Sequence, residues 1–537
     1  KVEYDKDMPS CLIRPMDGDT PIEDFTIVDL KDADGNAVHP TGGAFRALAG
    51  TYTFALQARG YLYYQGSVTV TADGENLFQI PLTGLGSAPW DGTTQTEPQK
   101  DGEGTYLIGT GAELAWYISY LTDSGNDRTV NARLTADIEL AGYPFITGAI
   151  LYGTFDGAGH KIDNLYRNES YSGGVIVGGL FNTIAGNGTT DGVTANGAVK
   201  NVTVNGTIEV NATVDGSVLS SSSVQVGGIA GRLFWGNTNI QKGNPDRYSA
   251  ITNCVSNIDI TVNCVVTGSA SELRVGGIVA NSRGENVDAA NSNFGLALVE
   301  DCVNNGNINV DISGSYGIPC TVGGVTGQTG LGTQMTNVAN HGTVSVRNST
   351  PMTRVLDVGG IVGYAHYNLS NTSADKTDTA TILEHMWNSG TVSAVYTGTG
   401  ASDSNNWMRI GGIAGNLYIS ANKSDKSFSD AYNQGAVSAQ WETGKGTPSV
   451  GGIIGWVRPN SGEPFVASDL YTTQGVVLDG TSNAPDGSNY IYTFTNSYYQ
   501  AEDDSSFGTK LNPAVLTLTP ETVQEADKTG VKNYYNA

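Results

Sequence analysis

Three aromatic residues occupy matching places in a repeated sequence and could form a binding surface for sugars. Trp387, Tyr432 and Tyr471 fall in the same column of three successive repeats. If the repeats stack as strands, their side chains lie about 4.8 Å apart along the stack. Such a ladder could stack against sugar rings. The alternative is that the three aromatic side chains pack on each other or beneath a loop. We predict these three as ligand-binding residues.

Catalysis on a polysaccharide would require a different pattern. A lyase would combine acids that hold Ca²⁺ with an Arg or Lys base, and a hydrolase would need a close pair of carboxylates. Asp137, Asp156 and Asp163 are instead explained by turns or by ladders of stacked side chains, and none recurs with a basic partner at strand spacing. We therefore predict no catalytic residues and favour a protein that is not an enzyme, with a polysaccharide lyase or glycoside hydrolase as an open alternative.

The sequence also lacks a recognisable pattern of metal ligands. The five histidines are dispersed, and the five cysteines show no CxxC spacing, so we expect neither a metal nor a cofactor. Cys254 and Cys302 fall at the same place in successive repeats. We interpret them as small buried apolar residues, with a disulfide between adjacent repeats as the alternative.

The charge balance excludes some classes of partner. The chain of 537 residues has 28 Lys and Arg against 53 Asp and Glu, a formal charge of −25. Such a surface would repel nucleic acid and anionic lipid. No run of about 18 apolar residues is present, so we expect no insertion into a membrane. The start at Lys1 favours a mature or trimmed chain, and we expect a monomer.

A hydrophobic block with paired glycines organises the elements that would position any site. It is first complete as Val226-Gly227-Gly228-Ile229-Ala230-Gly231, after a degenerate copy at 177–182, and it recurs at 275, 322, 358, 410 and 450. Repeats with a fixed block and spacers of unequal length indicate a solenoid with variable loops. Each repeat contains three β-prone segments, so we assign one coil to each repeat, with two short coils as the competing count.

Two further columns support the stacking of coils. In the first column, every repeat before the last has glycine except one, which has Asn257. This column predicts a corner with positive φ. The other holds Asn or Asp, from Asn201 to Asp469, and predicts a ladder in which each side chain bonds its neighbour one coil away. His385 would interrupt that ladder.

The composition and hydrophobic pattern divide the chain into four parts. Residues 1–87 alternate in the manner of a small antiparallel β-sandwich, and residues 88–104 form a linker rich in Gly, Thr and Pro. Residues 105–500 form the parallel β-helix, with one helix near 111–121 that caps its first coil. Residues 501–537 break the repeat and form a C-terminal cap or an exit segment. The fold class is therefore all-β.

Two resemblances add to this interpretation. The Gly-Gly-Ile-x-Gly blocks, the Asn-Cys-x-x-x-Gly blocks and the lead-in segments at 134–138 and 153–160 resemble the GLUG-motif repeat proteins of bacterial cell surfaces. The resemblance implies secretion, a right-handed parallel β-helix and adhesin-like roles, with no shared catalytic residues. The Gly-Thr-Tyr segment at 50–52 and Gly60-Tyr61 resemble carboxypeptidase-regulatory-like or PEGA-type surface modules, which act as spacers.

These observations lead to a functional expectation. We expect a secreted or cell-surface, adhesin-like binding protein that recognises a glycan or a host or matrix surface through the β-helix. A structural spacer that displays other domains is the main alternative, followed by the polysaccharide-degrading enzyme.

Overall fold

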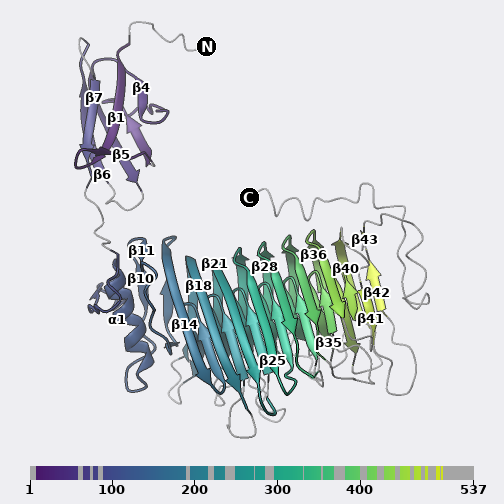
Figure 1. Ribbon diagram of the computed structural model, residues 1–537. Helices are drawn as coiled ribbons and strands as arrows, with labels where there is room; N and C mark the ends of the chain where they lie inside the picture. The colour runs from purple at the N-terminus through teal and green to yellow at the C-terminus, as the bar shows by residue number, and fades with distance from the viewer. Residues whose placement is uncertain are drawn as a thin grey trace. The chain divides into compact units, whose positions relative to one another are not determined.

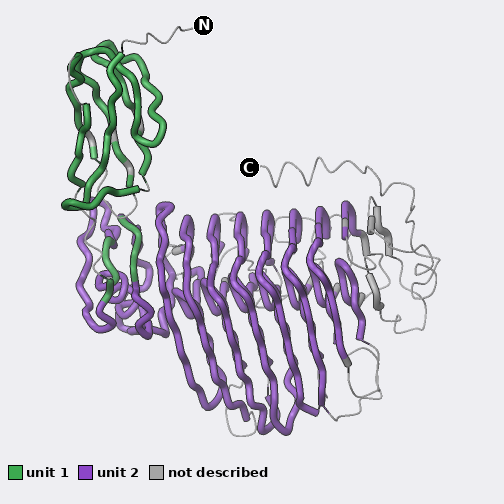
Figure 2. Tube along the Cα trace, turned by 45° about the horizontal axis from the view of Figure 1, so that its top comes forward, with its two compact units in different colours: residues 1–90, 109–111, 136–139 green, residues 91–108, 112–135, 140–537 purple. Residues whose placement is uncertain are grey.

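The computed structural model divides the chain into two compact units (Figure 2). The first comprises Lys1–Trp90, Gly109–Gly111 and Ala136–Glu139, and the second Asp91–Ile108, Ala112–Thr135 and Leu140–Ala537. The structure describes residues 8–499 apart from 24, 59–63, 73–75, 83–88, 189–193, 216–222, 236–247, 271, 285–295, 331, 352–354, 368–380, 399–407, 420–427, 442–447, 460–464, 473–477, 482–491 and 496–497. The predicted tail, 501–537, lies outside the described residues.

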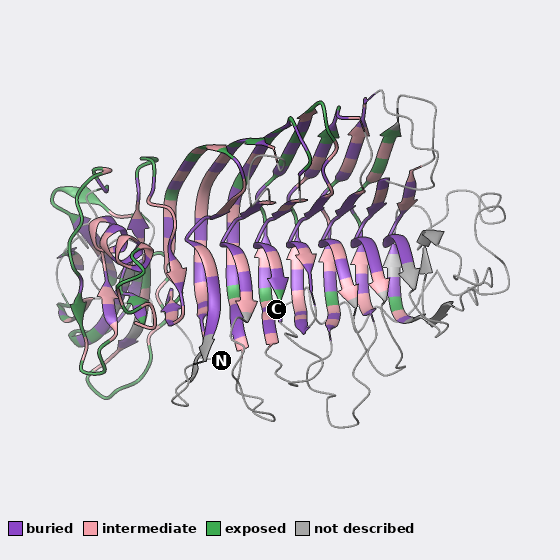
Figure 3. Cartoon of the chain, turned by 90° about the horizontal axis from the view of Figure 1, so that it is seen from below, coloured by how far each residue is buried: buried purple, intermediate pink, exposed green. Residues whose placement is uncertain are grey.

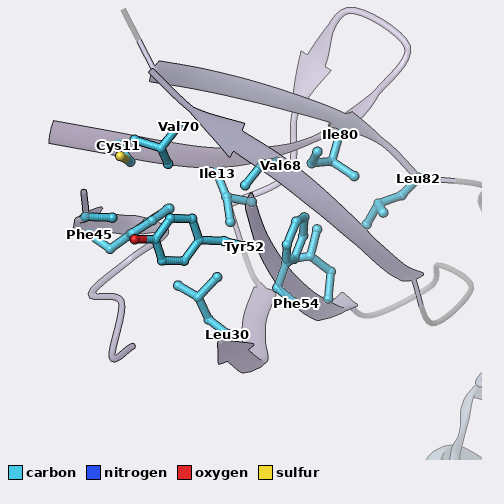
Figure 4. Packing of buried hydrophobic residues seen from close by; sticks show 12 residues of the cluster. Cys11, Ile13, Leu30, Phe45, Tyr52, Phe54, Val68, Val70, Ile80 and Leu82 are labelled. Atoms are coloured by element: carbon cyan, nitrogen blue, oxygen red, sulfur yellow. The ribbon is translucent and has the colours of Figure 1, made fainter. Parts of the chain in front are cut away.

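The first unit is a β-sandwich of two small sheets. One sheet contains β1 (Ser10–Asp17), β2 (Thr20–Pro21), β4 (Ala44–Arg46) and β7 (Asn76–Pro81), and the other contains β3 (Phe25–Lys31), β5 (Gly50–Ala58) and β6 (Tyr64–Val70). Ile13 and Ile80 from the first sheet meet Phe54, Leu56 and Val68 from the second in one buried cluster (Figure 4). The sandwich is therefore as predicted, although β1 and β7 pair in parallel rather than antiparallel.

The predicted linker contains some regular structure. Gln99–Lys100 form β8, which pairs antiparallel with β9 (Tyr106–Ile108). The Asp91 carboxylate accepts hydrogen bonds from the backbone N–H groups of Thr93 and Thr94 at 2.9 and 2.7 Å, which fixes a turn.

A single helix, α1 (Gly111–Thr122), precedes the solenoid, as the capping pattern predicts. Its apolar residues Leu114, Tyr117, Ile118 and Leu121 are fully buried. The Tyr117 ring stacks on Phe155 of the first coil, with 6.1 Å between ring centroids. The helix therefore covers the apolar end of the first coil, as expected for a solenoid cap.

The second unit is a parallel β-helix built from three stacks of strands (Figure 1). The short seven-stranded stack contains β15 (Val175–Gly178), β19 (Ser223–Gly227), β22 (Glu272–Gly276), β26 (Cys320–Gly323), β30 (Leu356–Gly359), β34 (Met408–Gly411) and β38 (Ser449–Gly451). The ten-stranded stack contains β12 (Ile150–Leu151), β16 (Phe181–Gly188), β17 (Thr194–Ala195), β20 (Ala230–Trp235), β23 (Val279–Arg283), β27 (Thr326–Thr329), β31 (Val362–Tyr367), β35 (Ala414–Ile419), β39 (Ile454–Pro459) and β41 (Leu478–Thr481). We call these the seven-stranded and ten-stranded sheets.

The remaining strands form one large, bent sheet, which we call the long sheet. Besides β8, β9, β10 (Ala132–Leu134), β11 (Ile138–Glu139) and β13 (Thr154–Asp156), it contains β14 (Lys161–Ser172), β18 (Ala198–Val214), β21 (Tyr248–Val266), β24 (Leu296–Asn304), β25 (Ile308–Gly314), β28 (Thr333–Asn340), β29 (Val344–Asn348), β32 (Ile382–Asn388), β33 (Val392–Tyr396), β36 (Phe428–Asn433), β37 (Val437–Trp441), β40 (Phe465–Thr472), β42 (Tyr492–Thr495) and β43 (Tyr498–Tyr499).

The strand register confirms one coil per repeat. Val226 pairs with Val275, and Val275 pairs with Val322 one coil further on. Consecutive copies of the glycine block are therefore direct neighbours. Buried and exposed positions alternate along the strands (Figure 3), and the inward positions are filled by Val, Ile, Leu, Ala and Cys.

Close backbone contacts explain the three glycines of the organising block. A Cβ on Gly227 would lie closer than 3.0 Å to the Ala230 carbonyl, and one on Gly228 would meet the carbonyl of Gly277 in the next coil. A Cβ on Gly231 would meet Ile176 and the backbone of the preceding coil. The block is therefore the tight turn by which the chain passes from the seven-stranded to the ten-stranded sheet.

The corner inside the long sheet differs from the prediction. Positive φ occurs in the Asn/Asp column, for example 50° at Asn253 and 56° at His385. The glycine column is required for another reason, because a Cβ on Gly390 would clash with the carbonyl of Gly342 one coil away. The ladder itself is confirmed, since Asn253 Nδ2 donates to Asn201 Oδ1 at 2.8 Å. His385 continues it rather than interrupting it, with its Nδ1 2.6 Å from Asp430 Oδ2.

Candidate functional site

The structure places the three predicted aromatic residues in one column of the long sheet. Trp387 pairs with Tyr432, and Tyr432 pairs with Tyr471, in successive strands β32, β36 and β40. The side chains of Trp387 and Tyr432 are half-buried. The position of the Tyr471 side chain lies outside the described part of the chain. The predicted register is thus present on the outer face of the coil.

Neighbouring side chains already contact both rings of this column. His341 meets Trp387 edge to face, with ring centroids 4.5 Å apart. The Tyr432 hydroxyl accepts a hydrogen bond of 2.5 Å from Gln434 Nε2. These contacts fix the orientation of the rings and leave part of each ring for a ligand.

A second polar and aromatic surface lies where the outer faces of the seven-stranded and ten-stranded sheets meet. Gln225 lies between the core residues Val224 and Val226, so its side chain points to the outer face. It is nevertheless fully buried, because Arg232 of the adjoining sheet lies against it and donates from Nε to Gln225 Oε1 at 2.9 Å.

The two columns that contain Gln225 and Arg232 continue through the following coils. We call this surface the polar seam, and it comprises Gln225, Arg274, Thr321, Asp357, Arg409 and Ser449 from the seven-stranded sheet and Arg232, Asn281, Arg283, Gln328, Tyr364, His366, Asn416, Tyr418 and Trp456 from the ten-stranded sheet.

A buried carboxylate lies in the later coils of the seam. Asp357 is 1% exposed, and its Oδ2 accepts a 3.1 Å hydrogen bond from Asn416 Nδ2. Its Oδ1 lies 3.5 Å from Arg409 NH1. Burial raises the pKa of Asp357 to about 6, although Arg409 and Asn416 act in the opposite direction. The Arg409 guanidinium also lies over the Trp456 ring, 5.5 Å from its centroid.

Aromatic rings lie beside this carboxylate on the ten-stranded sheet. Tyr364 and Tyr418 are stacked, with ring centroids 6.5 Å apart, and His366 lies 4.9 Å from the Tyr418 ring. All three are half-buried. Burial lowers the pKa of His366, and the charge of Arg283 lowers it further, so the surroundings favour the neutral ring.

Several buried polar atoms in the seam have no hydrogen-bond partner. They include donors and acceptors alike: Gln225 Nε2, Thr321 Oγ1, His366 Nε2 and Asn416 Oδ1. Burying a polar atom without a partner costs about 1–3 kcal/mol, so such groups are usually satisfied by a ligand or an ordered water. A ligand for this surface must both donate and accept hydrogen bonds.

The sequence pattern alone did not identify the seam, although it contains a signal. The residue before the hydrophobic position of each complete glycine block is polar in all six copies: Gln225, Arg274, Thr321, Asp357, Arg409 and Ser449. Alternation assigns these residues to the outer face, where polar residues are ordinary. Contacts between the two sheets bury Gln225, Thr321, Asp357 and Ser449 and half-bury the two arginines, and those contacts exist only in the folded coil. Trp456, which directly follows the last glycine block, belongs to the seam.

Other functional classes would require metal ligands or a membrane-spanning helix within the described residues. Among them, no three His, Cys, Asp or Glu side chains lie close enough together to hold a metal ion. No helix in the described ranges has the length and hydrophobicity that crossing a membrane requires. No protein-family model and no curated protein matches the sequence.

Proposed function

We propose that this protein is a secreted or cell-surface, adhesin-like bacterial protein whose β-helix binds a glycan at the polar seam. The single observation that carries the proposal is the group of Asp357, Asn416, Tyr418 and His366, in which buried unpaired polar atoms lie beside half-exposed rings.

Sugar hydroxyls match the hydrogen-bonding demand of this group. Each hydroxyl can donate one hydrogen bond and accept others. A saccharide can therefore satisfy the acceptor Asn416 Oδ1 and a donor such as Gln225 Nε2 with the same type of group. A metal cation could serve only the acceptors, and a simple anion only the donors.

The rings supply the second requirement of a sugar site. A pyranose ring presents an apolar C–H face, and an aromatic ring contributes a large apolar area while the polar groups around it fix the orientation of the ligand. Tyr364 and Tyr418 lie on adjacent strands of a rigid sheet, so little conformational freedom is lost when a ligand binds. The repeat along the solenoid axis suits an extended chain of sugars.

A glycan array followed by calorimetry on the tightest glycan tests the proposal. Tyr418→Ala and Tyr432→Ala form a matched pair, because both are half-buried tyrosines on strands of the same coil, one in the seam and one in the predicted aromatic column. We expect Tyr418→Ala to weaken binding by about tenfold or more, the equivalent of about 1.4 kcal/mol, and Tyr432→Ala to leave it within about twofold.

The other outcomes identify the alternatives. Loss of binding in Tyr432→Ala alone would move the site to the aromatic column of Trp387, Tyr432 and Tyr471. Absence of binding to every glycan would favour the structural spacer or a protein ligand on a host or matrix surface. Release of reducing ends or unsaturated products from a polysaccharide would support the enzyme.

A further inference from the structure

Three arginines gather in the early coils of the polar seam. Arg232 lies on β20, Arg274 on β22 and Arg283 on β23. Arg274 pairs in register with Gln225, whose Oε1 accepts the Arg232 Nε hydrogen bond. Arg274 Nε donates in turn to Gln328 Oε1 of the next coil at 2.6 Å. The Arg283 side chain lies over Gly330, where a Cβ would be 2.6 Å from its Cγ.

Arg232 and Arg274 are linked through Gln225, and the charges of Arg232 and Arg283 both act on Arg274. Burial lowers the pKa of Arg274 to about 10, Glu272 raises it, and the charges of Arg232 and Arg283 lower it. Glu272 is paired with Arg274 and also acts on Arg232. Among the described residues, the Glu272 carboxylate acts on Arg232 and Arg274, and the three guanidinium groups concentrate positive charge in a chain whose formal charge is −25. This concentration of positive charge is opposite to the charge of the whole molecule.

The same place contains an unsatisfied donor. Gln225 is fully buried, its Oε1 is occupied by Arg232, and its Nε2 has no hydrogen-bond partner. Guanidinium and amide N–H groups all donate and cannot accept. A ligand group that fits this part of the seam must therefore be an acceptor, and a carboxylate is the planar acceptor that guanidinium groups bind in bidentate fashion.

We propose that the arginine cluster of Arg232, Arg274 and Arg283 binds the carboxylate of a sugar acid, within a glycan that is otherwise neutral. This inference rests on the proposed function, because it says which sugar of the glycan bound along the same seam is acidic and where that sugar binds. The net charge selects against the other anionic polymers. A polyanion such as nucleic acid or polygalacturonate brings a charge on every unit, so the net negative charge of the chain repels it more strongly than it repels an isolated carboxylate.

Pairs of oligosaccharides that differ only at the carboxylate test this inference. The glycan array should carry acidic glycans, such as sialyllactose and glucuronic-acid-branched xylo-oligosaccharides, with their neutral parents and carboxyl-reduced forms. The expected result is that the acidic member of one pair binds about tenfold or more tightly than both neutral forms, a typical value for a charge-assisted hydrogen bond.

Substitutions then locate the effect. Arg274→Gln and Arg283→Gln should bring the ratio of the affinities for the acidic and the neutral member to within about twofold of one, a ratio that a general weakening of glycan binding would not change. Arg347→Gln, an exposed arginine on β29 of the long sheet, is the charge-matched control and should keep the preference. Arg283 is exposed, so its variant is informative even if Arg274→Gln does not fold.

The outcomes separate this inference from the proposed function. Equal binding of acidic and neutral forms, with Tyr418→Ala still weakening both, would overturn the carboxylate site and leave the glycan site standing. Tighter binding of polygalacturonate or duplex DNA than of any oligosaccharide would also overturn it. An array without any bound glycan would contradict the proposed function itself.

Discussion

The Asn340 side chain donates a hydrogen bond of 2.8 Å from Nδ2 to Oδ1 of Asn388, its neighbour one coil along the solenoid. Both side chains are fully buried. The same bond links Asn304 to Asn340 and Asn388 to Asn433, and each amide also donates to the carbonyl of a glycine two residues later. This inner ladder joins the coils through their core, in addition to the ladder at the corner.

Asn388→Ala should destabilise the β-helix strongly. It removes the acceptor of Asn340 and leaves the Asn433 Oδ1 and Gly390 carbonyl without this donor. Buried groups that lose a partner cost about 1–3 kcal/mol each, so we expect the free energy of unfolding to fall by about 3 kcal/mol. Urea denaturation measures the change. Ser389→Ala, at the next position on the surface, should shift the midpoint little, and equal shifts for both variants would refute a special role of the ladder.

The second glycine of the organising block is required because the inner ladder lies against it. A Cβ on Gly360 would lie closer than 3.0 Å to both the Gly412 carbonyl and the Asn388 amide. Gly360→Ala should therefore lower the free energy of unfolding by about 3 kcal/mol or more, as overpacking in a rigid core does. Gly102→Ala is the control, since its Cβ would meet nothing within 4 Å. Similar thermal midpoints for the two variants would show that the backbone of the glycine block can shift to accommodate an added methyl group.

Asp357 should make stability depend on pH in a defined direction. Its pKa is about 6 in the folded state against an ordinary value of 3.8, so between these values the folded protein binds more protons than the unfolded chain. The contribution of Asp357 to the free energy of unfolding must then fall as pH rises from about 4 to about 6, by up to about 3 kcal/mol.

Asp357→Asn removes this titration. We expect the difference in unfolding free energy between Asp357→Asn and the unsubstituted protein to grow in favour of the variant from pH 4 to pH 7, because other titrating groups cancel in the comparison. Urea titrations at unit steps of pH provide the measurement. A difference that does not change with pH would mean that Asp357 titrates normally in the folded protein.

The cysteines should be unreactive while the protein is folded. All five are free and buried. Burial raises the pKa of Cys264 to about 12 and also raises the pKa values of Cys302 and Cys320, so little thiolate forms at pH 8. Ellman's reagent should detect less than one thiol per native chain and all five in guanidinium chloride. Two or more thiols that react at once in the native protein would contradict this packing.

The solenoid could be predicted from the sequence because every coil requires the same types of residue at the same positions. Backbone approach requires the glycines at each block, and the core requires an apolar residue at most inward positions, so the six complete copies give the same signal. The corner was predicted with the wrong column, because Asn253 and His385 take positive φ where glycine was expected to. Small polar side chains tolerate this conformation when a neighbouring coil supplies a hydrogen bond.

The register of the aromatic column could be predicted from the sequence, whereas the polar seam could not, for a physical reason. Trp387 and Tyr432 were found because identical spacing places them in one column. The seam depends on contacts between two strands of different sheets, such as Arg274 with Gln328, which are 54 residues apart in the chain. No local period encodes that pairing, and the burial of Asp357 follows from it.

The most direct test of the central claim is a crystal structure of the protein with the oligosaccharide that binds most tightly on the array. The account predicts a sugar in the polar seam, with a hydroxyl group within hydrogen-bonding distance of Asn416 Oδ1 and a sugar ring against Tyr418. A sugar that lies over Trp387 and Tyr432, with only water at Asn416, would contradict the assignment of the seam as the glycan-binding site.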